Sequence, residues 1–537
     1  MALDSNAETG MRVSFARGGS ALCLVGLLAL PGAAPAAATD TRLADAAARQ
    51  DTRSVRELLE AGVDVDARQP DGATALQWAA HWNDLQMADL LLQVGADVDA
   101  ANSLGVTPLA LACENASRAL VERLLRAGAN PDLAQASGLT PLMIAARTGN
   151  ANVVEALLGR GADVDARVRK TGHSALMWAV GEGHRASVRL LVAQGADVEA
   201  RATTGFTPLL FAARSGDIES AAVLLAAGAD VNRSGSDGTH ALPLAILNLR
   251  DRFALYLLEQ GADPNGTLHG VPALHMAAGD VTHWIREWTH LRGVGPRVHR
   301  LRQLDPGRRV TLVEALLARG ADPDGRITTS TTASPNTTLK DGAFNYFAVG
   351  TGNLRGATPL WVAAWTLHDR QQSGSPDVVR ALLAAGADFR LTTADRTTPL
   401  MAAAGLGHRG GLGRVGMVRG PVVPLVEEGV RILVEAGADI NAVNEADFTP
   451  LHGAAFIASN EVIEYLVKQG ADIDAQQHEG QTAFRLAEGS AAGGFMWHTY
   501  PETAALLASL GADTTLGVDG ETLARRRDVP PAPGRQE

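Results

Sequence analysis

Cysteine is almost absent from this sequence, which contains only Cys23 and Cys113 among its 537 residues. Two cysteines form at most one disulfide, so a disulfide-stapled scaffold is excluded. Aromatic residues account for only 4% of the chain, whereas glycine occurs 57 times. This composition favours short, closely packed helices joined by tight turns over one thick core. Positive charge is also scarce, with 47 Lys and Arg against 59 Asp and Glu, which argues against nucleic acid as a partner.

Long hydrophobic runs are missing too, apart from a short one near the start. Residues 21–30 (ALCLVGLLAL) follow two arginines and precede the small residues Ala36 and Ala38. This order is typical of a secretory signal peptide, and the run is too short for a membrane span. We therefore predict a signal peptide over residues 1–38 and an exported chain, periplasmic or secreted, with no stable membrane span after cleavage.

What the sequence does contain is a repeat. The tripeptide Gly-Ala-Asp, or a close variant, recurs every 33 or 34 residues at first and at several longer intervals later. Its glycines are Gly62, Gly95, Gly128, Gly161, Gly195, Gly228, Gly261, Gly320, Gly386, Gly437, Gly470 and Gly511. A second motif, Thr-Pro-Leu, begins at Thr107, Thr140, Thr207, Thr358, Thr398 and Thr449. Such self-similarity is the signature of a repeat architecture.

Each part of the repeat has a local physical reason. Threonine caps the free N–H groups at the start of a helix, and proline suits the first helical position. Small pairs such as Ala145-Ala146 let a neighbouring helix approach. A second amphipathic helix follows, as in NVVEALLGRG, and Gly161 supplies the left-handed residue that ends it. One such unit cannot bury its own apolar face, so the copies are expected to stack.

The pattern resembles the ankyrin-repeat family, whose T-P-L-H-x-A-A signature is nearly reproduced by TPLHGAA at 449–455. The resemblance implies an all-α ankyrin-repeat solenoid of about twelve helix-turn-helix repeats with short β-hairpin loops over residues 39–520. It also implies a non-catalytic scaffold that binds a protein. The unit at Leu43 and the unit at Thr482 depart from the signature and are expected to cap the two ends. Residues 521–537 are expected to form a solvated tail.

Long spacings between the glycines mark insertions. The surplus residues lie near 279–309, 326–355, 367–376, 409–426 and 489–501. We therefore expect an exported, bacterial-type member of the family with loop insertions.

The first insertion is rich in arginine and contains Trp284 and Trp288, and we predict that it is a specialised contact surface. Its His283, Glu287 and His290 are spaced so that they share one helical face, which leaves a metal site as an alternative. No H-E-x-x-H motif or cysteine pair supports that alternative, so solvated side chains are favoured. No catalytic residue, cofactor or metal ligand is predicted.

Two further motifs have both a functional and a structural interpretation. GLGHRGGLGRVG at 405–416 contains the spacing of dinucleotide-binding loops twice. It follows a first helix rather than a strand, and alignment with RTGN at 147–150 makes Gly407 the residue that ends this helix. Paired aspartates such as Asp64 and Asp66 suggest calcium, but none continues into a calcium-binding loop. Turn formation is therefore predicted for them.

Candidate binding residues follow from the resemblance. Partners of such proteins meet the concave side, which is formed by hairpin tips and by the ends of the first helices. The predicted partner-binding residues are His81, Trp82, Arg147, Glu182, Arg214, Trp284, Trp288, Trp365 and Phe456. An open alternative is that Trp82, Trp365 and Phe456 pack on the insertions instead. Trp78 and Trp178 fall one turn earlier and are expected to belong to the stack.

Two other functions stay open. The insertions supply histidines, arginines and tryptophans, so an enzyme or metal-binding protein with its site built by the insertions is one alternative. Nothing in the sequence fixes a nucleophile, a base or a cofactor for it. A secreted effector that acts on a host protein is the other. The partner protein itself is not identified by the sequence.

Overall fold

The computed structural model describes residues 40–281, 284–285, 288, 305–329, 351–368, 374–408, 423–492, 496–519 and 522. The predicted signal peptide lies outside these residues, as do most of the insertions and of the C-terminal tail. The described chain divides at Gly238 into two compact units. We call residues 40–237 the N-terminal unit and residues from 238 onward the C-terminal unit, and we describe each by itself.

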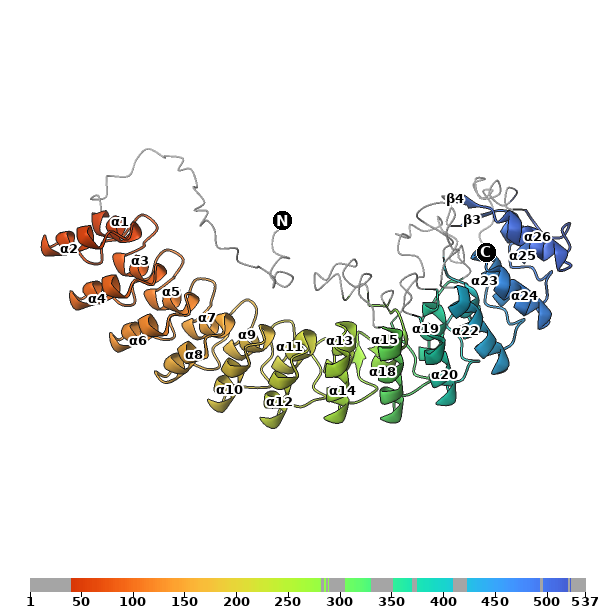
Figure 1. Cartoon of the computed structure of the whole chain (residues 1–537), viewed down its shortest axis with the longest axis horizontal. Helices are drawn as coiled ribbons and strands as arrows, with labels where there is room; N and C mark the ends of the chain where they lie inside the picture. The colour runs from red at the N-terminus through yellow and green to blue at the C-terminus, as the bar shows by residue number, and fades with distance from the viewer. Residues whose placement is uncertain are drawn as a thin grey trace, which may run out of the picture. The chain divides into compact units, whose positions relative to one another are not determined.

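The N-terminal unit is an all-α stack of helix pairs in two layers (Figure 1). Each first helix contacts the first helices of the neighbouring pairs, and the second helices contact one another in the same way. The helices are α1 (Arg42–Ala48), α2 (Thr52–Glu60), α3 (Ala75–His81), α4 (Leu85–Gln93), α5 (Pro108–Glu114), α6 (Arg118–Arg126), α7 (Pro141–Thr148), α8 (Ala151–Leu158), α9 (Ala175–Gly181), α10 (Arg185–Ala193), α11 (Pro208–Ser215) and α12 (Ile218–Ala226). The helix pairs expected from the repeat are confirmed.

The C-terminal unit continues the same pairing of first and second helices. Its elements are α13 (Ala241–Leu247), α14 (Asp251–Glu259), β1 (Thr267–Leu268), β2 (Val271–Pro272), α15 (Ala273–Ala278), α18 (Pro306–Ala318), α19 (Pro359–Thr366), α20 (Pro376–Ala384), α21 (Pro399–Ala404), α22 (Val423–Glu435), α23 (Pro450–Phe456), α24 (Asn460–Lys468), α25 (Ala483–Glu488), β3 (Ser490–Ala492), β4 (Met496–His498) and α26 (Pro501–Ser509). Strand β1 pairs antiparallel with β2, and β3 pairs antiparallel with β4. In the other described repeats the hairpin is a turn without strands.

The first helices start where the sequence predicts. The Thr107 hydroxyl accepts the N–H of Ala110 at 3.2 Å, and Pro108 occupies the first helical position. His452 adds a second bond at the start of α23, because its Nδ1 accepts the backbone N–H of Thr449 at 3.1 Å. These caps fix where α5 and α23 begin.

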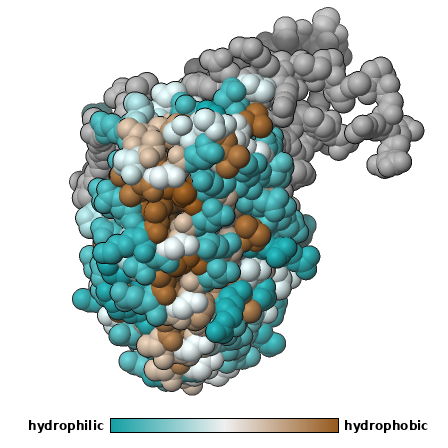
Figure 2. Space-filling model, turned by 90° about the vertical axis from the view of Figure 1, so that its right-hand side faces the viewer, coloured by the Kyte–Doolittle hydropathy of each residue, from teal (hydrophilic) through white to brown (hydrophobic). Residues whose placement is uncertain are grey.

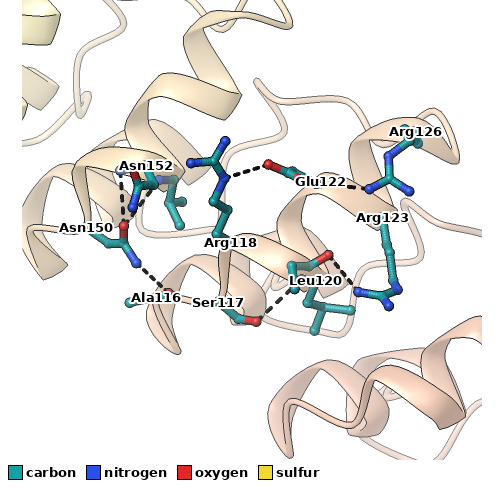
Figure 3. Close-up of polar contacts among 11 residues, drawn as sticks. Ala116, Ser117, Arg118, Leu120, Glu122, Arg123, Arg126, Asn150 and Asn152 are labelled. Carbon is teal, nitrogen blue, oxygen red and sulfur yellow. Dashed lines mark hydrogen bonds and ion pairs between the residues drawn. The ribbon is translucent and has the colours of Figure 1, made fainter.

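Polar side chains at the start of the second helices connect successive repeats (Figure 3). The Asn150 side chain donates to the Ala116 carbonyl at 2.7 Å, while its oxygen accepts the N–H of Asn152 at 3.1 Å. Arg123 of α6 forms an ion pair with Asp89 of α4 at 2.9 Å. One side chain therefore caps its own helix and satisfies a carbonyl of the preceding repeat.

The paired acidic residues form a ladder along the hairpins. The backbone N–H of Asp97 donates to the Asp66 carboxylate of the preceding repeat at 2.8 Å, and the N–H of Asp99 donates to Asp97 at 3.0 Å. Asn441 accepts the N–H of Asp472 at 2.8 Å in the same way, so an amide oxygen serves as well as a carboxylate. The predicted turn-forming role is confirmed. In the part of the chain that the structure describes, no three His, Cys, Asp or Glu side chains are grouped to hold a metal.

The last helix pair closes the C-terminal unit with a partly apolar end. Leu506 and Leu510 of α26 are half-buried. Figure 2 faces this end of the molecule and shows a brown hydrophobic band within a mostly teal surface. Among the described residues, no helix has the length and apolar character needed to cross a bilayer.

Candidate functional site

The candidate site of the N-terminal unit lies at the C-terminal ends of its first helices. Five repeats place there the residues seven and eight positions after the Thr or Ser cap. We call them the end row: His81, Trp82, Glu114, Asn115, Arg147, Thr148, Gly181, Glu182, Arg214 and Ser215. None of the ten is buried. The repeat thus offers one exposed position per helix that varies in chemistry while the stack beneath stays the same.

Three aromatic rings stand together at one end of this row. Trp82 is 42% exposed and stacks on Trp78, with ring centroids 6.5 Å apart. His81 lies edge-on to both, at 5.5 Å from Trp78 and 4.7 Å from Trp82. Both indole N–H groups are held, since Trp78 donates to Gln69 at 2.7 Å and Trp82 donates to the Ala48 carbonyl at 3.1 Å. The rings are therefore fixed in place before any partner arrives.

Arg147 occupies the middle of the end row between an acid and an indole. Its guanidinium forms an ion pair with Glu114 of the preceding repeat at 3.8 Å. Its Cζ lies 6.0 Å from the ring centroid of Trp178 in the following repeat. Both members of the ion pair are partly exposed, so the pair contributes little to stability. The ring contact instead orients the guanidinium.

Arg214, two repeats further on, also lies against an aromatic ring, here one of its own helix α11. Its Cζ lies 5.1 Å from the ring centroid of Phe211. His173 packs edge-on against Phe211 at 5.5 Å and against Trp178 at 5.3 Å. Burial and, secondly, the Arg214 charge lower the pKa of His173. Glu182 stands exposed between the two arginines.

Two further tryptophans belong to this surface. Trp78 and Trp178 were expected to belong to the stack, but both are only half-buried and contact end-row residues. Both tryptophans lie at the fourth position after the cap, as Phe211 does. An aromatic residue at this position is the sequence pattern that identifies them. Leu104, at a hairpin tip, is 64% exposed and was not singled out.

The equivalent positions at α19, α21 and α23 of the C-terminal unit are buried. Trp365 and Phe456 are only 6% and 8% exposed. Trp365 stacks on Trp361 at 5.1 Å and lies 4.0 Å from the His408 ring. All eight residues of α19 are buried. Of the three aromatics for which packing on the insertions was the alternative, Trp365 and Phe456 are buried, whereas Trp82 is exposed.

The start of the first insertion helps to close this face. Trp284 and Trp288 are 2% and 6% exposed. Trp284 lies edge-on to Trp361 at 6.0 Å and donates its N–H to the Leu354 carbonyl at 3.4 Å. The two tryptophans predicted as contact residues are therefore interior residues, and the Trp284 ring packs against Trp361 of α19. His283, Glu287 and His290 lie outside the described residues.

Most insertions begin at the same place in the repeat, after the first helix. Four of them begin where a first helix ends, after α15, α19, α21 and α25, and so start at or just beyond the positions that are equivalent to the end row. At the first of these, a Cβ on Gly279 would lie 2.0 Å from Oγ1 of Thr366, and the N–H of Asp280 donates to that oxygen at 2.9 Å. The chain itself therefore covers these positions.

The glycine-rich stretch needs a correction. Helix α21 ends at Ala404 and is capped by Gly405 in the left-handed region, two residues before the predicted stop at Gly407. The chain turns early because Leu406 becomes buried and Gly405 approaches the Gly453 carbonyl, which a Cβ would meet at 2.8 Å. Residues 409–422 lie outside the described part of the chain.

The remaining titratable groups in the interior have structural roles. Burial lowers the pKa of His275, His368 and His452 to about 4, and each bonds a backbone carbonyl. Burial also raises the pKa of the Cys113 thiol, so this cysteine is protonated and unreactive.

Comparison with known families matches more than half of the chain to ankyrin repeats. A family model of ankyrin repeats in three copies matches residues 43–135, 115–202 and 199–267. Related models match residues 355–394 and 426–467. These ranges include the whole end row.

Several proteins are similar over part of their length. The chain is 30% identical over 134 residues to E3 ubiquitin-protein ligase KEG of Arabidopsis thaliana, covering 25% of this chain and 7% of that protein. It is 34% identical over 148 residues to human ankyrin repeat and SOCS box protein 16, covering 27% and 29%. It is 43% identical over 53 residues to human protein phosphatase 1 regulatory subunit 27, covering 10% and 34%. The chain thus spans about a third or less of these relatives.

Among solved structures, the human ASB11 ankyrin repeat domain is 28% identical. The match covers 41% of this chain and 96% of that one, with a TM-score of 0.36.

Proposed function

Because this chain belongs to the ankyrin-repeat family, we propose that it is a protein-binding scaffold whose binding surface is the end row of the N-terminal unit. One contrast carries the proposal. The ten end-row residues are all at least partly exposed, whereas the corresponding residues at α19, α21 and α23 in the C-terminal unit are buried. Those buried residues are Trp365, Thr366, Gly405, Leu406, Phe456 and Ile457. A partner therefore finds open side chains on the N-terminal unit and buried ones at α19, α21 and α23.

The chemistry of the end row suits a protein partner. Tryptophan and arginine are the residues that most often carry interface energy, and Trp82, Arg147 and Arg214 are held by neighbouring groups. Side chains already in place lose little entropy when a partner binds. We propose a non-catalytic role on this basis, since these features serve recognition.

Capture with matched variants tests the proposal. The full chain is immobilised, partners are captured from extracts of the source organism, and Trp82→Ala and Arg147→Glu are compared with Arg189→Glu. Arg189 is exposed on α10, away from the end row, and provides the same charge reversal. We expect loss of the same captured proteins with both end-row variants and full recovery with Arg189→Glu. Equal recovery with all three contradicts the assigned surface.

We also propose that the chain is exported to the periplasm or the cell exterior. The order of arginines, apolar run and small residues within 1–38 supports export. N-terminal sequencing of the protein recovered from cell fractions and medium tests it. We expect a mature chain that begins near Thr39; a cytoplasmic chain that begins before Ala36 contradicts export.

A further inference from the structure

We infer that the end row binds a partner segment in the polyproline II conformation whose every third residue faces the row, in the order apolar, positive, negative, positive, negative. This inference rests on the proposed function and specifies the partner of the same site. Spacing and charge carry it together.

The spacing of the repeats matches the polyproline II helix. Successive first helices of the N-terminal unit pack directly on one another, and packed helices lie about 8–10 Å apart. A polyproline II segment has three residues per turn and rises about 9 Å in that turn. Each third residue therefore returns to the same face one repeat further along. A β-strand turns alternate residues to opposite faces and does not keep this register.

The charges of the end row alternate from repeat to repeat. Trp82 is followed by Glu114, then by Arg147, Glu182 and Arg214, one in each successive repeat. Trp82 and Glu182 stand one position further from the cap than the other three, and Glu182 lies at the exposed end of α9. A partner that places a cation opposite each glutamate and an anion opposite each arginine meets opposite charge at every repeat.

The ion-pair contacts within the end row can be replaced by contacts to a partner at little cost in free energy. The Glu114–Arg147 pair is long, at 3.8 Å, and partly exposed, so its replacement costs little. Within the described chain Glu182 forms no ion pair with either flanking arginine. Arg147 has one face toward the Trp178 ring, and the N–H edges of a guanidinium held in this way are oriented to donate to a carboxylate.

Trp82 sets the apolar end of the segment. Its N–H is already bonded to Ala48, so the indole offers a ring face and no free donor. Aromatic faces of this kind are what proline-rich polyproline II segments dock on. An apolar residue or proline therefore belongs opposite Trp82, three residues from the first cation.

Synthetic peptides test the register. One labelled peptide carries Leu, Lys, Asp, Lys and Asp at every third position with Pro-Ala between them, made in both chain directions. A second exchanges Lys and Asp, and a third places the same five residues at every second position. Binding to the full chain is measured by fluorescence anisotropy at low salt. We expect one direction of the first peptide to bind about tenfold more tightly than the other two peptides, and the difference to shrink in high salt.

A charge-exchanged protein provides the matched control. The variant Glu114→Lys, Arg147→Glu, Glu182→Lys, Arg214→Glu keeps the row but inverts its order, and far-UV circular dichroism checks its fold. We expect it to prefer the Lys/Asp-exchanged peptide. The single variants Arg147→Glu and Arg214→Glu, which are expected to weaken binding of the first peptide, replace it should it not fold. The inference is overturned if the parent chain binds the peptides equally, binds none of them, or prefers the peptide with the five residues at every second position. It is also overturned if the charge-exchanged variant keeps the preference of the parent chain. If partner capture depends on the end row while the chain shows no preference among the peptides, that result supports the proposed protein-binding function and contradicts only the inferred polyproline II register.

Discussion

A Cβ atom on Gly407 would lie 2.2 Å from Cζ3 of Trp365. This glycine belongs to the stretch whose spacing matches a dinucleotide-binding loop, yet its missing side chain makes room for an indole. Its φ is +86°, a conformation that also favours glycine. Both the packing of the Trp365 ring and the backbone conformation therefore require glycine at this position. Neither requirement involves phosphate binding.

Gly407→Ala is predicted to destabilise the chain by about 3 kcal/mol, since it adds left-handed strain to a clash with the Trp365 ring. Gly386→Ala is the matched control. Gly386 has a φ of +90° but nothing within 4 Å of the added Cβ, so only the strain of about 1 kcal/mol is expected. Urea unfolding followed by tryptophan fluorescence measures both, and equal midpoints for the two variants contradict the packing role.

Stability is predicted to fall below pH 6.5 because of the buried histidines. The pKa of His452 is about 4 in the folded chain against an ordinary value of 6.5. Between these values the unfolded chain takes up a proton that the folded chain does not, so stability is full above pH 6.5 and is lost as the pH falls toward 4. The loss is about 1.4 kcal/mol per pH unit for each such histidine.

His452→Gln tests the assignment of this pH dependence. It removes one of the titrating groups, with His275 and His368 left in place. The slope of unfolding free energy against pH, measured from pH 7 to pH 5, is expected to become shallower than in the parent chain. An unchanged slope would show that other groups cause the loss.

The acidic ladder is predicted to depend on the acceptor oxygen rather than on charge or calcium. Asp66→Ala removes the acceptor for the N–H of Asp97 and is expected to cost about 1 kcal/mol. Asp66→Asn keeps an oxygen in the same place, as Asn441 does naturally, and is expected to cost less than about 0.5 kcal/mol. Thermal unfolding measures both, and EDTA is expected to leave the parent midpoint unchanged. A shift of the parent midpoint with EDTA argues for a bound ion.

Substitutions at Trp82 and Trp361 are predicted to affect different properties, namely partner binding for Trp82 and folding stability for Trp361. Trp361→Ala leaves a cavity beside Trp284 and Trp365 and is expected to cost about 3–5 kcal/mol. Trp82→Ala removes a ring that is 42% exposed and is expected to cost about 1 kcal/mol while abolishing capture of partners. Chemical unfolding and capture are measured on both, and a Trp82→Ala variant with full capture contradicts the role of the end row.

The helix pairs were predictable because their causes are local. Thr107 and Pro108 start a helix by a cap three residues away, and Gly149 ends one through its own φ of +82°. The repetition of these residues at a fixed interval identifies the stack without any long-range information. The stop of α21 was misplaced by two residues for the opposite reason, since the approach of Gly405 to α23 comes from a distant part of the chain.

By itself the sequence determined the repeat, the start of the first helices that carry the Thr-Pro-Leu motif and the position of the end row along the chain. Only the tertiary structure decided which of those positions are open. Trp82 and Trp365 occupy comparable places in their repeats, but Trp365 is covered by residues brought from other repeats, including His408, whereas Trp82 keeps an exposed ring. Exposure depends on what packs against a side chain from elsewhere in the chain, and a local pattern carries no information about that neighbour.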